Sequence, residues 1–222
     1  MKTSTIRLAF VLFTTIFFGQ GCLAQNQPDP AAPAPTQTAP PPATTPAPAS
    51  PSPSTAPAPG ADPYANVLGP EFKVLGYSIR PPKDFTYTIQ PIQDLSRRTF
   101  TWQGALHQDG CVTTIAIGIK HLNAPEPHPA SEFMIGFYKG LSKTLTNTKM
   151  SPSQPLIVGG MQALRATWVG TVAAKRSHPT LQGFVYVIQD GATQLSVVGT
   201  DSHPYFTKTF STLNASARSF HK

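Results

Sequence analysis

The chain has 222 residues, with 17 Lys and Arg against 10 Asp and Glu, and a formal net charge of +7. It contains 25 prolines but only two cysteines, Cys22 and Cys111, too few for the framework of a disulfide-rich scaffold. We expect no disulfide within the mature chain and expect Cys111 to be a buried free thiol.

The first residues predict an export signal. Lys2 and Arg7 give a positive start, and Leu8 to Phe18 form an apolar run broken only by two threonines. This run has about half of the ~20 residues that a membrane-spanning helix needs, so it is typical of a signal-peptide core.

Two cleavage sites compete at the end of this signal. The stretch "FFGQGC" resembles a lipobox, and cleavage before Cys22 would remove residues 1–21 and leave Cys22 to carry lipid. Cleavage after Ala24 by a general signal peptidase would remove Cys22 and release a soluble periplasmic or secreted protein. We expect lipid attachment at Cys22 and keep the second cleavage as the alternative.

Residues 22–63 are predicted to be a disordered tether. From residue 26 this segment is mostly Pro, Ala, Thr and Ser, with no aromatic and no large aliphatic side chain, so it cannot bury enough apolar surface to order itself. Its prolines favour an extended polyproline II chain, which suits a spacer. The folded domain is therefore expected in residues 64–222.

The first half of the domain predicts strands. Residues 97–102 place Phe100 and Trp102 on one face, and residues 111–121 alternate between Ile and smaller or polar residues. A turn signal, Gln108-Asp109-Gly110, lies between the two runs and predicts a hairpin.

The second half alternates helix, strands and helix. A helix is expected over residues 129–145, where apolar residues recur every four positions. Two strands are expected in 154–173, joined at Gly159-Gly160, and a hairpin in 183–200 with its turn at Asp190-Gly191. The first arm of that hairpin is apolar on both faces and predicts a central strand. The closing helix spans 202–220, with Ser202 as its expected cap. The class is α+β, an antiparallel sheet flanked by helices.

Several segments resemble PsbP-like/DcrB-like domains. They are "GYSIRPPKDF", "FTWQG", "VGGMQALRATWVG", "GFVYVIQDG" and "ASARSF", which together extend over nearly the whole domain. The resemblance implies an α/β/α sandwich around an antiparallel sheet. It also implies an accessory, assembly or envelope protein, often a bacterial lipoprotein, and it supplies no catalytic residue.

No sequence pattern predicts a catalytic or metal site, and no cofactor is expected. The six histidines show no i, i+4 pair, and H-E-x-x-H, C-x-x-C and G-x-S-x-G are absent from the sequence. The alternative is a secreted hydrolase or metal-dependent enzyme whose site is assembled in space, for instance from His107, His121 and Asp109.

The positive charge is the remaining functional signal. Arg97, Arg98, Lys175 and Arg176 form two adjacent pairs that could contact an anionic partner. A secreted anionic-polymer binder is therefore the other alternative function, and the second interpretation of these cations is a solubilising surface with scattered charge. No aromatic-basic interleaving typical of a nucleic-acid module is present, so no specific nucleic-acid partner is expected. The sequence thus predicts a non-enzymatic, exported envelope lipoprotein that faces the periplasm. Its expected partner is an envelope protein or an anionic envelope component, and its oligomeric state is left open.

Overall fold

The computed structural model describes residues 64–88, 97–122, 129–172 and 178–222. The expected signal peptide, Cys22 and the tether all lie outside these residues. Neither helix of the described part reaches the length and hydrophobicity that crossing a bilayer requires.

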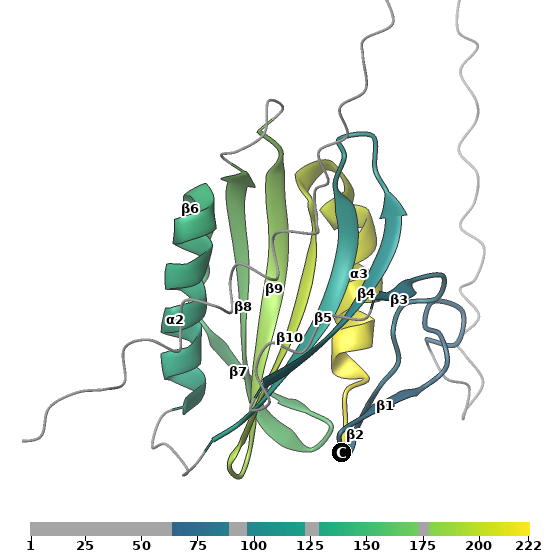
Figure 1. Ribbon diagram of the computed structural model, residues 1–222, viewed down its shortest axis with the longest axis vertical. Coiled ribbons are helices and arrows are strands. Elements are labelled where there is room, and N and C mark those ends of the chain that lie inside the picture. Colours follow the sequence, from purple (N-terminus) through teal and green to yellow (C-terminus); the bar gives the residue numbers. More distant parts are fainter. Residues whose placement is uncertain (1–63, 89–96, 123–128, 173–177) are drawn as a thin grey trace, which may run out of the picture.

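The core of the fold is an antiparallel sheet of eight strands (Figure 1). The strands are β3 (Thr86–Thr88), β4 (Arg97–Leu106), β5 (Val112–His121), β6 (Leu145–Met150), β7 (Gln154–Val158), β8 (Met161–Val172), β9 (Thr180–Asp190) and β10 (Thr193–Ser202). Their order is β3-β4-β5-β10-β9-β8-β6, and β7 also pairs with β8. The apolar arm predicted to be a central strand is β9, which lies inside the sheet between β10 and β8.

The three hairpins predicted from glycines are present. Gly110, Gly160 and Gly191 have φ values of 73°, 79° and 56°, in the left-handed region that glycine adopts without strain. Tight turns make neighbouring strands antiparallel, and the measured register agrees with this expectation.

Two helices cover opposite faces of the sheet. α2 (Pro129–Thr144) packs on β6, β8 and β9, whereas α3 (His203–Arg218) packs on β10 and β9 (Figure 1). Because side chains alternate along a strand, β9 supplies both faces: Phe184 and Tyr186 lie in the core under α3, and Val185 and Val187 lie in the core under α2.

Small elements near the N-terminal side complete the α3 face. β1 (Phe72–Val74) pairs with β2 (Tyr77–Ile79), and the Tyr77 ring stacks on Phe220 with centroids 5.5 Å apart. A bridge between Ser78 and His221 ties β2 to the C-terminal segment. This hairpin covers part of the sheet face that α3 leaves open.

Three expectations need correction. The described residues form mostly sheet with two helices, so this part of the chain is less helical than the expected α/β/α sandwich. Cys111 is fully buried but disulfide-bonded, so the expectation of a free thiol is wrong. Ser202 occupies the N-cap position of α3 without a side-chain capping bond, and its backbone N–H instead donates to Asp201 Oδ1 at 2.8 Å.

Candidate functional site

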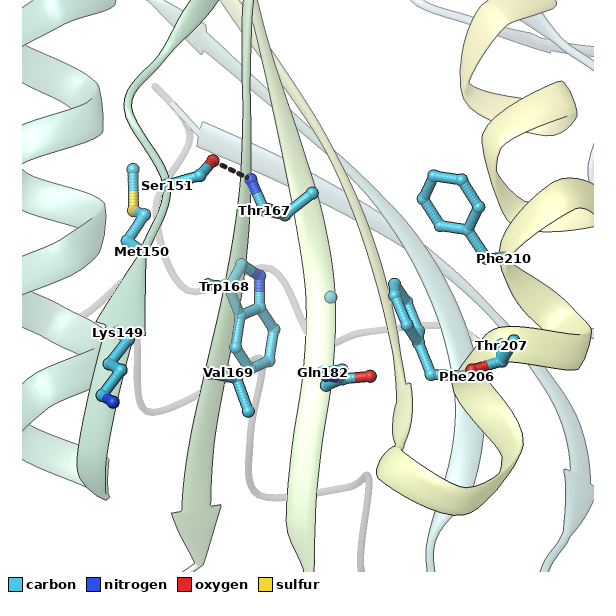
Figure 2. Close-up of a pocket in the computed structure, with 11 residues that line it drawn as sticks. Lys149, Met150, Ser151, Thr167, Trp168, Val169, Gln182, Phe206, Thr207 and Phe210 are labelled. Atoms are coloured by element: carbon cyan, nitrogen blue, oxygen red, sulfur yellow. Dashed lines mark hydrogen bonds between the residues drawn. The ribbon is translucent and has the colours of Figure 1, made fainter.

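An open groove of about 540 Å³ lies on the α3 face of the sheet (Figure 2). It lies beside α3, over strands β6, β8 and β9. Its lining residues are Lys149, Met150, Ser151, Thr167, Trp168, Val169, Gln182, Gly183, Phe206, Thr207 and Phe210. This volume falls within the ~300–1,000 Å³ typical of small-molecule sites.

The strand register places three groove residues side by side. Lys149 of β6 is the direct partner of Val169 in β8, and Val169 is the direct partner of Gln182 in β9. Direct partners in an antiparallel pair project to the same face, so the ammonium, the apolar side chain and the amide form one row across the groove. Figure 2 shows this row opposite the side chains of α3.

A break in the edge of the sheet shapes the outer wall. β6 ends at Met150 and β7 begins at Gln154. The two short strands pair one after the other with the same edge of the long strand β8. Ser151 bridges the break: its backbone N–H donates to Thr167 O at 2.9 Å, and its Oγ accepts from Thr167 N at 3.0 Å. The β8 backbone is thereby hydrogen-bonded even at the break.

Aromatic side chains of α3 form the inner wall. Phe206 and Phe210 are half-buried, with ring centroids 5.4 Å apart, and Phe210 meets Phe184 of the sheet edge-to-face. Thr207 is exposed on the next helix position and lines the groove without contributing to the core. The inner wall is therefore apolar and partly open to solvent.

One cationic side chain lines the groove and a second lies near it, in contact with the Phe210 ring. Lys149 is exposed at one end, and Arg165 lies about 13 Å away along β8, at ~3.3 Å per residue from Val169. The Arg165 guanidinium is 5.4 Å from the centre of the Phe210 ring and 5.9 Å from that of Tyr186. Its Nε is buried and has no hydrogen-bond partner among the described residues.

Tyr186 responds to this environment. Burial raises the pKa of its phenol, while the nearby charges of Arg165 and Arg218 act in the opposite direction. The phenol donates to Asn214 Oδ1 at 2.6 Å. Arg165 of β8 and Arg218 of α3 thus both lie near the Tyr186 phenol, and no carboxylate of the described residues lines the groove.

A second polar cluster lies at the start of α3. The fully buried carboxylate of Asp201 accepts hydrogen bonds from Thr113 at 2.9 Å and from Thr209 at 2.7 Å. His107 Nε2 lies 2.9 Å from the other carboxylate oxygen, and its ring stacks on Tyr205 with centroids 3.9 Å apart. The cluster connects the ends of β4, β5 and β10 to α3.

A spatially assembled enzyme site would require a His–carboxylate pair of this kind. Here, however, the Asp201 carboxylate already accepts hydrogen bonds from Thr113, Thr209 and the Ser202 N–H. The Thr113 hydroxyl gives its hydrogen to Asp201, so the hydrogen-bond network assigns His107 Nε2, which lies close to both residues, the role of donor. Asp201 has no exposed surface. The arrangement stabilises the sheet–helix junction, as expected for a buried charge whose partners are hydrogen-bonded.

The three residues named for the alternative, spatially assembled site do not come together. His107 lies at the turn end of the β4–β5 hairpin, whereas His121 lies at the far end of β5, roughly 30 Å away at ~3.3 Å per residue. Asp109 Oδ1 accepts from the Cys111 N–H within the turn. Within the described ranges, no three His, Cys, Asp or Glu side chains are grouped closely enough to hold a metal ion.

The predicted basic contacts are only partly described. Lys175, Arg176 and the side chain of Arg97 lie outside the described residues. Arg98 is half-buried on β4, opposite Ile119 of β5, far across the sheet from the groove. The structure therefore does not test whether these four residues act together, and it reveals different cations, Lys149 and Arg165, beside the groove.

Asp190 has a structural role beyond its turn. Its Oδ2 accepts from the Tyr77 phenol at 2.7 Å and from the Lys222 ammonium at 2.8 Å. The bond from Lys222, followed by that from Tyr77, lowers the pKa of Asp190 below its ordinary value. Burial and the bond to Asp190 raise the pKa of Tyr77 to about 12. These contacts join the β9–β10 turn to β2 and to the C-terminal residue.

The fold is similar to that of known proteins. Cyanobacterial PsbP (CyanoP) from Synechocystis sp. PCC 6803 has a TM-score of 0.54 and 11% identity, with 70% of this chain and 92% of that chain covered. LpqN, described as involved in cell envelope biogenesis of Mycobacterium tuberculosis, has a TM-score of 0.47 and 11% identity, with coverages of 65% and 82%. The Saccharomyces cerevisiae Ran-binding protein Mog1p has a TM-score of 0.44 and 14% identity, with coverages of 70% and 95%.

The similarity to CyanoP shows a PsbP-like fold, as the sequence resemblance implied. No family model matches the chain, and no curated protein sequence matches it. At 11% identity the likeness concerns the fold alone, so any function must be argued from the groove.

Proposed function

We propose that this chain is an exported accessory binding protein of the cell envelope, and that its PsbP-like domain binds an envelope component in the groove beside α3 without transforming it. The observation that carries the proposal is the groove itself, with an apolar wall from α3, the cation Lys149 in its lining and, among the described residues, no acidic or histidine side chain in that lining. Such a lining can hold a ligand, and it offers neither a carboxylate nor an imidazole for acid–base catalysis.

The predicted signal and tether support the location. An apolar run after two positive residues directs export, and a Pro-rich segment is suited to hold a domain away from a surface. Lipid attachment at Cys22 remains our prediction for the anchor. Within a monomer, lipid attachment at Cys22 excludes a disulfide of Cys111, because Cys22 is the only other cysteine in the sequence and its sulfur cannot be both a thioether and part of a disulfide.

A matched pair of variants tests the binding role. The protein is purified from envelopes of its own host, and non-covalently bound molecules are identified by mass spectrometry. Thr207→Trp fills the groove from an exposed position, whereas Lys139→Trp adds the same side chain on the exposed surface of α2. We expect a bound component with the wild type and with Lys139→Trp but not with Thr207→Trp. Equal loss or equal retention in both variants would contradict the proposal.

A further inference from the structure

We propose that the groove binds an anionic amphiphile, a single acyl chain with a carboxylate or phosphate head group. The chain lies against the apolar wall of α3, and the head group pairs with Lys149. This inference rests on the proposed function, because it names the ligand class of the same groove.

The shape of the groove suits an elongated apolar group. Val169 forms part of the floor, and Phe206 and Phe210 form the wall, so an acyl chain between them removes apolar surface of both partners from water. The groove is open at its outer side and about 540 Å³ in volume, which leaves room for a chain with its head group at the solvent.

Charge selects an anion. Lys149 is the exposed cation of the lining, and Arg165 adds a second positive charge next to Phe210. The acidic side chain nearest in register is Asp201, the direct strand partner of Gln182. Its carboxylate is fully buried and already accepts from two hydroxyls, one backbone N–H and His107, so it does not neutralise the lysine.

Backbone hydrogen bonding favours an acyl chain over an extended peptide. A peptide that binds along a strand usually gains affinity by adding to a sheet edge. The groove is instead formed by the face of the sheet, and β8 is already paired with β9 on one side and with β6 and β7 on the other. A peptide backbone placed there would lose hydrogen bonds to water with few replacements, whereas an acyl chain has none to lose.

The test uses calorimetric titration of the purified exported protein with defined probes below their micelle concentrations. Dodecanoate and dodecyl phosphate are expected to bind. Dodecyl maltoside has the same chain without the charge, and acetate and inorganic phosphate have the charge without the chain; all three are expected to bind at least about tenfold more weakly, a difference of ~1.4 kcal/mol.

Matched variants locate the binding. Lys149→Glu is expected to weaken dodecanoate binding at least tenfold, while Lys208→Glu, an exposed lysine of α3 that does not line the groove, leaves it unchanged. Thr207→Trp is expected to abolish binding. Thermal unfolding of each variant, expected to match the wild type, shows that the domain remains folded.

Four results would overturn the inference: no binding of either anionic amphiphile, equal binding of dodecyl maltoside, equal effects of the two lysine variants, or tighter binding of an acidic peptide without an acyl chain. The proposed function fails separately. A host component that Thr207→Trp displaces, together with no amphiphile binding in solution, would retain the function and reject this ligand class.

Discussion

Trp168 and Gly183 are direct partners on strands β8 and β9, and the indole lies over the glycine. A Cβ placed on Gly183 would be 2.5 Å from Trp168 Cζ2 and 2.5 Å from Gly199 O, so only glycine fits beneath this ring. The same pairing recurs on the other face, where Phe184 lies over its partner Gly199. Aromatic rings thus cover glycines in the middle of the sheet, beside the groove.

Gly183→Ala is expected to destabilise the domain by about 1–3 kcal/mol, because the added methyl group overpacks the site and must displace the Trp168 ring or the β10 backbone. Urea denaturation measures the loss. Gln182→Ala, at the neighbouring half-buried position, is the control and should change stability much less. Equal stability of Gly183→Ala and the wild type would show that the ring does not require glycine.

Asp201→Ala is expected to cost about 3 kcal/mol or more, since it leaves the Thr113 and Thr209 hydroxyls and the Ser202 N–H without their acceptor in a buried place. Asp201→Asn keeps an acceptor oxygen and should cost less. Denaturation of both variants checks the order. A folded, fully stable Asp201→Ala protein would contradict the structural role and return the His107 pair to consideration as a catalytic site.

The Asp190 contacts predict two pH ranges of stability loss. The folded pKa of Asp190 is lowered, so its contribution is complete above the ordinary value of about 4 and is lost as pH falls further. The folded pKa of Tyr77 is raised to about 12. Its contribution to stability is therefore complete below pH 10.0 and is lost as the pH rises from 10.0 toward about 12.

Thermal unfolding across pH measures both effects. Asp190→Asn should reduce the acid dependence, and Tyr77→Phe should reduce the alkaline dependence. Asp109→Asn, at the other hairpin turn, has no bond to a cation and serves as the carboxylate control. Acid profiles of the wild type and Asp190→Asn that run parallel would contradict the role given to Asp190.

The disulfide of Cys111 and the proposed lipid on Cys22 predict different thiol reactivity in the unfolded monomer: a disulfide-bonded Cys111 reacts with a thiol reagent only after reduction, whereas lipid on Cys22 leaves Cys111 reactive before reduction. The mass of the mature N-terminal peptide, measured on the same sample, determines whether Cys22 carries lipid. Labelling of Cys111 before reduction, with a diacylglyceryl mass on Cys22, would show that the native protein uses Cys22 for its anchor and that the disulfide does not form.

The long elements of the fold could be predicted because their signals are local. Alternating Ile residues in β5, the apolar period of α2 and the glycines at three turns each identify one element without knowledge of its neighbours. β1, β2 and β3 have three residues each, which is too short for an alternating pattern to be recognised. β6 follows α2 directly, so no turn residues separate it from the helix in the sequence.

The groove could not be predicted because it lies over a part of the sheet face that α3 leaves open, and the sequence does not show which part of the face stays open. Lys149 and Gln182 are 33 positions apart in the sequence and meet only through the register of β6, β8 and β9. The sequence predicted anionic contacts at residues that are adjacent in the chain, such as Arg97 and Arg98. Strand pairing, which the sequence does not show, decides which cations share a face of the sheet. The buried bond between His107 and Asp201 likewise joins distant elements.

Photo-cross-linking in intact host cells tests the central claim most directly. A small diazirine amino acid of about the size of methionine at position 207 lines the groove without filling it as the Trp of Thr207→Trp does, and the same amino acid at position 139 lies on the exposed surface of α2. The account predicts a light-dependent adduct with an envelope component from position 207 and none from position 139. Adducts of equal yield from both positions, or from position 139 alone, would contradict binding in the groove.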